Sequence, residues 1–239
     1  AIHGKLVQQN HNDEPAIELL KRINPDFTPC DNGHYTQLPF EAPQNWSWTT
    51  LGKIGKWQSG STPNRLNKDY YNGNIPWLKT GDLNNGYITH IPESITEKAL
   101  NETSVKLNPT GSVLIAMYGA TVGEHGITTK EMACNQAICA LLENKDYPYT
   151  YLFQIAKENQ QNLVNLAIGS AQQNISQILL KQLPVHSDVA TIHQYHCLAL
   201  PLHKEIELLQ SENRLLNTTR DALLPELMTG ELDLSSLDF

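Results

Sequence analysis

Apolar and polar positions divide the chain into three parts, residues 1–45, 46–187 and 188–239. In the first part, apolar residues recur at helical spacing between Glu14 and Ile23, which predicts a short amphipathic helix. Residues 25–45 are rich in Pro, Asn, Asp and Gly, a composition typical of a linker. We therefore expect one helix and a connecting segment before the main body of the protein.

The middle part alternates short apolar runs with turn signals, as short β-strands do. Five runs are predicted to form strands: Thr49–Ile54, Ile75–Leu78, Tyr87–Ile91, Gly111–Met117 and Ala137–Leu142. Longer apolar periodicity predicts a helix over Tyr149–Asn165 and a short one after Asn174. This mixture indicates the α+β class, with several short strands and a few helices.

The third part carries one long helical pattern between Thr191 and Leu227. Its seam positions alternate spacings of three and four over five heptads, as in a coiled coil. They are Ile192, Tyr195, Ala199, Leu202, Ile206, Leu209, Asn213, Leu216, Arg220, Leu223 and Leu227. We expect this face to pair with another helix, Asn213 and Arg220 being polar seam positions that set register. The alternative is an amphipathic helix docked on its own domain.

Proline and glycine mark the expected limits of this helix. Pro201 predicts a kink or a break near Leu200, because proline removes one backbone bond and clashes one turn back. Gly230 predicts the C-terminal cap. The sequence around Gly4 repeats the pattern around Gly230, which suggests a repeated unit of a domain followed by a helix.

The formal net charge of −8 is unevenly distributed. Residues 188–239 hold nine acidic and three basic residues, a net charge of −6, whereas residues 35–187 hold eleven of each. Within the latter, residues 52–79 carry five basic residues and one acidic residue, a local charge of +4. The overall sign therefore reflects the C-terminal part and does not exclude a DNA-facing surface in the middle part.

No sequence template for catalysis or metal binding is satisfied. Gly119–Gly123 is glycine-rich, but the Gly-Lys-Ser/Thr of a P-loop does not follow. A thiol nucleophile at Cys134 with His125 as its base lacks a third, orienting group. His193 and His196 lack the spacing of a structural zinc site. We expect no catalytic residue, no metal and no cofactor in this chain.

Cysteine usage and hydropathy bear on the compartment. The four cysteines are scattered without a Cys-x-x-Cys pair, which is typical of reduced thiols. No apolar run reaches the roughly 18 residues of a membrane span, and no basic-then-apolar leader opens the sequence. We expect a cytoplasmic protein with no membrane contact.

Small polar, amide and basic residues form the candidate DNA-binding set. Basic side chains neutralise phosphates, whereas hydroxyl and amide groups read base edges. The set is Ser61, Thr62, Arg65, Lys68, Lys79, Tyr118, Thr121, Gln173 and Asn174. For each, the alternative is an ordinary turn or helix cap, and the four tryptophans between residues 46 and 77 are more typical of a core.

Several motifs occur in a fixed order along the chain. They are Trp46–Gly52, Ser59–Pro63, Tyr70–Trp77, Gly81–Leu83, Gly111–Gly123, Cys134–Ile138, Ala171–Ser176 and Leu180–Pro184, flanked by Gly4–Val7 with Asp13–Ala16 and by Leu223–Pro225 with Gly230–Leu232. In this order they resemble a target-recognition domain of type I restriction-modification specificity subunits. The resemblance covers almost the whole chain, which looks like the C-terminal half of such a subunit.

This resemblance implies sequence-specific recognition of double-stranded DNA by a non-catalytic subunit. Residues 1–45 then correspond to the end of the central conserved segment and a linker, 46–187 to the target-recognition domain, and 188–239 to a conserved spacer helix and tail. In this family two such helices pair antiparallel, so the other specificity half is a partner. Methyltransferase subunits supply S-adenosylmethionine chemistry, and restriction-translocase subunits supply chemistry that depends on ATP and Mg.

Other interpretations stay open. A half-sized specificity subunit could act as a homodimer through its single helix, or the chain could be the specificity domain of another methyltransferase system. A free-standing enzyme and a purely structural coiled-coil adaptor are alternatives from other classes. The segment Pro184–Gln194 departs from the proline-rich run of the family, which leaves the docking of the helix start on a methyltransferase open.

Overall fold

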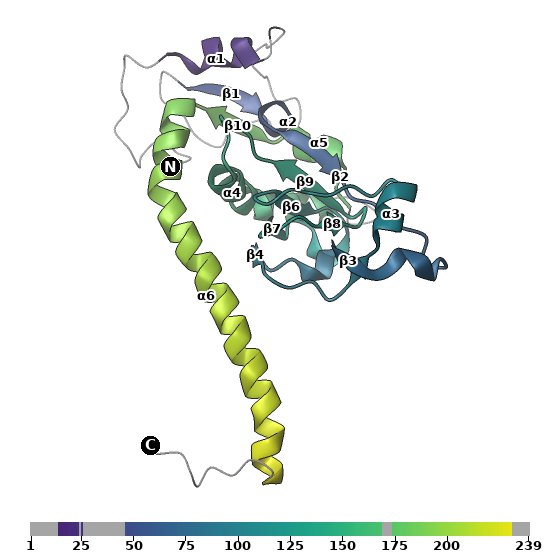
Figure 1. Ribbon diagram of the computed structural model, residues 1–239. Helices are drawn as coiled ribbons and strands as arrows, with labels where there is room; N and C mark the ends of the chain where they lie inside the picture. The colour runs from purple at the N-terminus through teal and green to yellow at the C-terminus, as the bar shows by residue number, and fades with distance from the viewer. Residues whose placement is uncertain (1–13, 24, 26–45, 169–173, 231–239) are drawn as a thin grey trace, which may run out of the picture.

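The computed structural model describes residues 14–23, 25, 46–168 and 174–230. Small sheets and helices pack together as one body, and a single long helix runs along its side and past it (Figure 1). The α+β class and the long C-terminal helix predicted from the sequence are therefore confirmed.

Ten strands and nine helical segments make up the described residues. The strands are β1 (Ser47–Thr50), β2 (Lys56–Ser59), β3 (Tyr71–Leu78), β4 (Gly86–Ile88), β5 (Ser94–Ile95), β6 (Val113–Ala116), β7 (His125–Thr128), β8 (Ala133–Cys134), β9 (Ile138–Leu142) and β10 (Pro184–Ser187). The α-helices are α1 (Ala16–Ile23), α2 (Leu51–Ile54), α3 (Glu97–Glu102), α4 (Tyr149–Ile168), α5 (Gln177–Lys181) and α6 (Val189–Thr229). Three single 3₁₀ turns are η1 (Lys68–Tyr70), η2 (Thr80–Asp82) and η3 (Gly119–Thr121).

A five-stranded sheet in the order β2-β9-β6-β7-β4 forms the centre of the domain. Strands β2, β9, β6 and β7 pair antiparallel, and β4 joins the edge parallel to β7. Every residue of β6 is buried, because both faces of this sheet are covered. A strand buried on both faces carries a continuous apolar run, which is why Gly111–Met117 was recognisable in the sequence.

The two faces of the central sheet belong to different apolar clusters. Val113 and Ile115 of β6 point into the cluster that includes α4 and α5, whereas Leu114 and Ala116 point to the opposite side. That opposite side is shared with Leu78 and Cys134, the last residues of β3 and β8 in a three-stranded sheet of order β5-β3-β8. The period-two alternation of a strand thus joins the two sheets and the helices into one core.

The remaining two strands close the domain. β1 pairs antiparallel with β10, Thr50 lying opposite Pro184 and Ser47 opposite Ser187. The first and last strands of the domain are therefore neighbours, beside the start of α6 (Figure 1).

Several predicted elements are confirmed, with shifted bounds. The helix predicted over Glu14–Ile23 is α1, the one over Tyr149–Asn165 is α4, and the short one after Asn174 is α5. Four of the five predicted strands are present as β3, β4, β6 and β9.

The strand predicted over Thr49–Ile54 was wrong in its last four residues. Only Ser47–Thr50 is extended, and Leu51–Ile54 forms the helical turn α2. Leu51 and Ile54 are both buried, and residues three apart share a side of a helix but lie on opposite faces of a strand. The prediction also missed five strands: β2, β7 and β10, which have four residues each, and β5 and β8, which have two residues each and show no period.

The long helix α6 is continuous over 41 residues from Val189 to Thr229. The break considered near Leu200 is absent, and the helix continues through Pro201. A proline removes only one hydrogen bond, and Ala199 and His203 on either side of it are buried against the domain. Gly230 caps the helix in the left-handed conformation at φ 75°, as predicted. The proposed equivalent, Gly4, lies outside the described residues.

One side of α6 docks on the domain through polar and aromatic contacts. The Tyr87 hydroxyl lies 2.9 Å from Nδ1 of the buried His203, whose ring also packs edge-on against Tyr149 and Phe153. About two helical turns further on, the Gln210 side chain accepts a 2.8 Å bond from the backbone N–H of Tyr87. Arg214 donates to the carbonyl oxygen of Thr89 at 3.0 Å. Beyond this point α6 extends away from the domain (Figure 1).

Among the described residues, no helix is both long and apolar enough to span a membrane.

Docking of α6 predicts a pH dependence of stability. Burial lowers the pKa of His203 in the folded protein, with Lys157 and His196 adding to the effect. An unfolded histidine titrates near pH 6.5, so on acidification the unfolded chain binds this proton first and the free energy of unfolding falls. We expect His203→Gln to lose less stability than the native protein between about pH 7.5 and 5.5, measured by urea unfolding.

His193→Gln is the matched control, because His193 lies exposed on the same helix. It should lose as much stability as the native protein. The slope in His203→Gln should be reduced and not abolished, since burial also lowers the pKa of His125 and His196. Equal losses in both variants would contradict this account of the docking.

Candidate nucleic-acid interface

The register of the sheets brings loops from distant parts of the chain to one edge. Ser59, the last residue of β2, lies opposite Cys139 near the start of β9, and Ala116 at the end of β6 lies opposite Ile138. The three-stranded sheet ends at the same place, because Asn135 donates to the carbonyl oxygen of Leu78. We call this end of the two sheets the loop edge.

The segment after β2 is held at the loop edge by close backbone packing. Ser61 donates to the carbonyl oxygen of Cys134 at 2.9 Å, and the Thr62 hydroxyl bonds the side chain of Gln136. A Cβ on Gly60 would lie 2.0 Å from the carbonyl oxygen of Asn135, so only glycine fits this approach. The Ser61 hydroxyl also lies 2.8 Å from that of Ser104.

A second loop, between β6 and β7, meets the segment before α5. Tyr118 and Asn174 form an isolated β-bridge, and the Asn174 side chain accepts a 3.3 Å bond from Gly119. Tyr118 is 41% exposed, and Thr121 donates to its carbonyl oxygen at 3.1 Å. Met117 donates to the carbonyl oxygen of Ala137, which places this loop beside the Asn135–Ala137 turn.

The basic residues Arg65 and Lys79 converge on one carboxylate. Arg65 donates to Glu93 at 2.7 Å, and Lys79 donates to the other oxygen of the same group. Lys79 immediately follows β3 at the loop edge, where its backbone N–H bonds the Asp82 side chain at 2.8 Å. The hydrogen bond from Lys79, together with Arg65, holds the pKa of Glu93 below its usual value, so this carboxylate stays charged.

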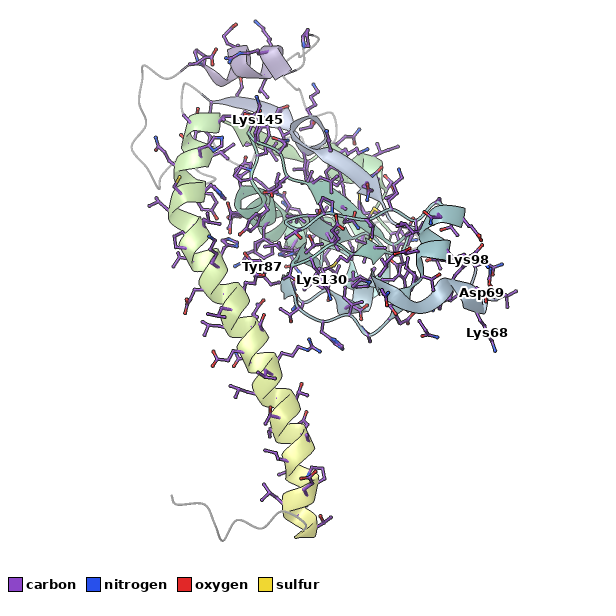
Figure 2. All side chains as sticks on the ribbon, viewed as in Figure 1. Lys68, Asp69, Tyr87, Lys98, Lys130 and Lys145 are labelled. Atoms are coloured by element: carbon purple, nitrogen blue, oxygen red, sulfur yellow. The ribbon has the colours of Figure 1, made fainter. Side chains whose placement is uncertain are left out.

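Lys68 lies apart from the loop edge, at the outer end of the domain. Figure 2 shows it beside Asp69 and Lys98, far from α6. Lys98 donates to Asp69 at 2.8 Å, and this bond lowers the pKa of Asp69 and raises that of Lys98. Lys68 itself lines a pocket together with Arg65, so the outer end and the loop edge are joined through Arg65.

Most of the candidate DNA-binding set is thus gathered in one region. Ser61, Thr62, Lys79, Tyr118, Thr121 and Asn174 lie at the loop edge, Arg65 connects to it through Glu93, and Lys68 lies further out. Gln173 lies outside the described residues.

Sequence reasoning missed two polar residues of the loop edge, Gln136 and Gln177, and one basic residue of the outer end, Lys98. Gln136 bonds Thr62 across 74 positions, and Gln177 donates to the Ser59 hydroxyl at 3.3 Å across 118. Lys98 was missed because it lies outside the basic segment 52–79 from which the candidate cations were taken. An amide in a short turn between two apolar runs, as at Gln136, is the signal that could have found the first of these.

The thiol-and-base pair considered from the sequence is unsuited to nucleophilic chemistry. Burial raises the pKa of Cys134 to about 12, so the reactive thiolate is not available at neutral pH. The ring of His125 is buried and bonds the carbonyl of Gly123. On α6, His196 bonds the Thr150 hydroxyl, and His193 is exposed. Within the described part of the chain, no three His, Cys, Asp or Glu side chains are grouped to hold a metal.

The predicted helix-pairing residues divide into two groups. Ile192 is buried and Tyr195 packs beside it against the core of the domain, as the docked-helix alternative expects. The later positions are all exposed: Leu202, Ile206, Leu209, Asn213, Leu216 and Leu223. We call the five apolar members of this second group the α6 stripe. Within this stripe, Leu202 and Leu209 directly precede the domain-facing His203 and Gln210, so these two members lie about 100° around the helix from them.

Comparison with known proteins places this arrangement in a family. Residues 43–186 match the type I restriction modification DNA specificity domain. The HindI specificity subunit of Haemophilus influenzae is 26% identical over 195 residues, covering 80% of this chain and 42% of that protein. The MjaIX specificity subunit of Methanocaldococcus jannaschii is 28% identical over 246 residues, covering 99% of this chain and 56% of that protein.

A solved structure shares the fold. The S subunit of a type I restriction-modification system from M. genitalium superposes with a TM-score of 0.57 at 15% identity, over 76% of this chain and 45% of that one. The chain spans about half the length of the relatives it matches. Because the matched family covers residues 43–186, more than half of the sequence, the chain belongs to the type I restriction modification DNA specificity domain family.

Proposed function

We propose that this chain reads part of a double-stranded DNA site as the non-catalytic specificity component of a type I restriction-modification complex. The observation that carries the proposal is the loop edge, where polar segments from five separate parts of the chain meet. Family membership supports it, because the matched domain is one of DNA specificity. The loop edge lies at the ends of buried strands, a rigid support for side chains that must match a fixed pattern of base edges.

The loop edge and the cations beside it have separate tasks. Lys79, Lys68 and Lys98 neutralise phosphates and position the domain along the duplex. Thr62, Gln136 and other hydroxyl and amide groups offer donors and acceptors to base edges. Glu93 and Asp69 keep the cations in place and limit the net positive charge, which restrains binding to DNA of any sequence.

Helix α6 serves as the spacer and pairing element. One side of it is fixed on the domain through Tyr87, and the exposed α6 stripe is free to pack against a second helix. The chain spans about half of its relatives, so that second helix belongs to another specificity half or, if none is present, to a second copy of this chain. A net charge of −6 over residues 188–239 suits protein contacts better than DNA contacts.

Reaction chemistry belongs to partner subunits in this proposal. Methyltransferase subunits bind S-adenosylmethionine, and a restriction-translocase subunit uses ATP and Mg, while this chain contributes the choice of site in the cytoplasm. The high pKa of the buried Cys134 argues against the alternative in which this thiol is a nucleophile.

A salt series tests the DNA-binding surface. In the double variant Lys68→Ala/Lys79→Ala, we expect weaker binding to duplex DNA and a shallower dependence of log affinity on log salt. Each lost phosphate contact reduces that slope by about 0.9. Fluorescence anisotropy of labelled duplexes between about 50 and 200 mM salt measures both quantities.

Lys130→Ala/Lys145→Ala is the matched control. Lys130 follows β7 and Lys145 follows β9, strands that start at the loop edge and end at the opposite side of the central sheet. This pair removes the same charge and should leave affinity and slope close to native values. Equal losses in the two double variants would argue against the loop edge as the DNA-facing side.

Light scattering tests the pairing face. We expect the purified chain to form a dimer of twice its 26.8 kDa mass, and Leu209→Asp/Leu216→Asp to be a monomer, because burying two carboxylates in a helix seam is costly. The control Leu208→Asp/Leu215→Asp makes the same change at exposed positions one residue earlier, on another side of the helix. A native monomer, or equal dissociation of both variants, would contradict self-pairing through the stripe.

A further inference from the structure

The turn from Asn64 to Lys68 presents an apolar side chain between two basic ones. Asn67 donates to the carbonyl oxygen of Asn64 at 3.1 Å, and Leu66 donates to the Asn64 side chain at 3.0 Å. These bonds fix a tight turn with Leu66 at its tip. Leu66 is 90% exposed, the largest exposed fraction among the large apolar side chains of the described residues.

A single exposed apolar side chain is ordinary on a protein surface, and what sets Leu66 apart is its position in a turn between two basic residues. Leu66 lies at the tip of a turn between Arg65 and Lys68. The positive charge of these two residues favours a polyanion as the partner. A nucleic acid offers both features, phosphates for the cations and the thymine methyl for an apolar tip.

Two aromatic rings and one carboxylate fix the orientation of the Arg65 side chain. Its guanidinium carbon lies 4.7 Å from the ring centroids of both Tyr71 and Trp77, and Glu93 accepts one of its N–H groups at 2.7 Å. The rings are themselves fixed, because Tyr71 donates to the carbonyl of Pro63 at 2.7 Å and Trp77 to that of Ser61 at 3.0 Å.

This fixed guanidinium remains available to a ligand. The Arg65 side chain is 50% exposed, and its fork has five N–H donors, of which the Glu93 bond uses one. It lines an open pocket of about 410 Å³ together with Lys68 and Asn72. An arginine whose orientation is set before binding loses little entropy on forming the two parallel hydrogen bonds that guanine O6 and N7 accept.

We infer that the Asn64–Lys68 turn is a base-reading element that enters the major groove. Arg65 reads a guanine there, Leu66 contacts the methyl of a nearby thymine, and Lys68 binds a phosphate. Glu93 is a positioning residue that holds Arg65 in its reading orientation. This inference rests on the proposed function and names the side chains that give part of its sequence preference.

Selection from a randomised duplex library tests the inference. The full 239-residue chain is incubated with the library, and the bound fraction is sequenced for native, Arg65→Lys, Leu66→Ala and Lys68→Ala proteins. Arg65→Lys keeps the charge but not the fork, so a preference for guanine at one position should fall by about tenfold while the other positions stay unchanged. Leu66→Ala should weaken a thymine preference within about two base pairs of that guanine.

Lys68→Ala provides the contrast, since it should reduce binding to all duplexes alike and leave every base preference in place. Leu66→Ala changes a side chain that is almost wholly exposed, so it tests the turn even if Arg65→Lys affects folding. The inference is overturned if Arg65→Lys and Leu66→Ala keep all native preferences within about twofold, or if Lys68→Ala removes the same preference as Arg65→Lys. If the native chain enriches no motif, the proposed function is overturned as well. If it enriches a motif that the Arg65 and Leu66 variants keep, only the role of the turn is overturned.

Discussion

Antiparallel pairing of β9 with both β2 and β6 is the constraint on which the candidate interface depends. β9 is buried between its two neighbours, and its register places Ile138 and Cys139 beside the ends of β6 and β2. A one-residue slip would turn its apolar side chains to the wrong cluster, so the core fixes this register. The strand register thereby brings the loops that carry Thr62, Tyr118 and Gln136 to one edge, where contacts such as the Thr62–Gln136 hydrogen bond hold them together.

The same core separates the two tasks of the molecule. Polar loops lie at one edge of the sheets, while α6 is fixed beside α4 and β4 through Tyr87, His203 and Gln210. Because docking uses one side of α6, the α6 stripe remains exposed for a second helix. In the proposed function, the acidic helix faces a protein partner and the basic residues 52–79 face DNA, which would account for a net charge of −8 in a DNA-specificity family.

The sequence predicted the elements that have an unambiguous local signal, such as a continuous apolar run or a helix-capping glycine. The apolar run Gly111–Met117 lies at the centre of the core, and Gly230 ends α6 where the helix-cap rule expects it. Leu51–Ile54 was misassigned because four residues do not distinguish a helical turn from a strand. The sequence indicated which types of residue form the candidate site, but it did not indicate which of these residues contact one another. Arg65 meets Glu93 across 28 positions and Thr62 meets Gln136 across 74, pairings that only the tertiary register decides.

Site-directed photo-cross-linking to duplex DNA tests the central claim most directly. A photoreactive amino acid in place of Gln136 lies at the loop edge, and one in place of Lys145 lies at the opposite side of the same sheet. If the loop edge faces the duplex, the label at Gln136 should cross-link to the recognised DNA and the label at Lys145 should not. Cross-linking from Lys145 with none from Gln136 would contradict the account and place the DNA on the other side of the domain.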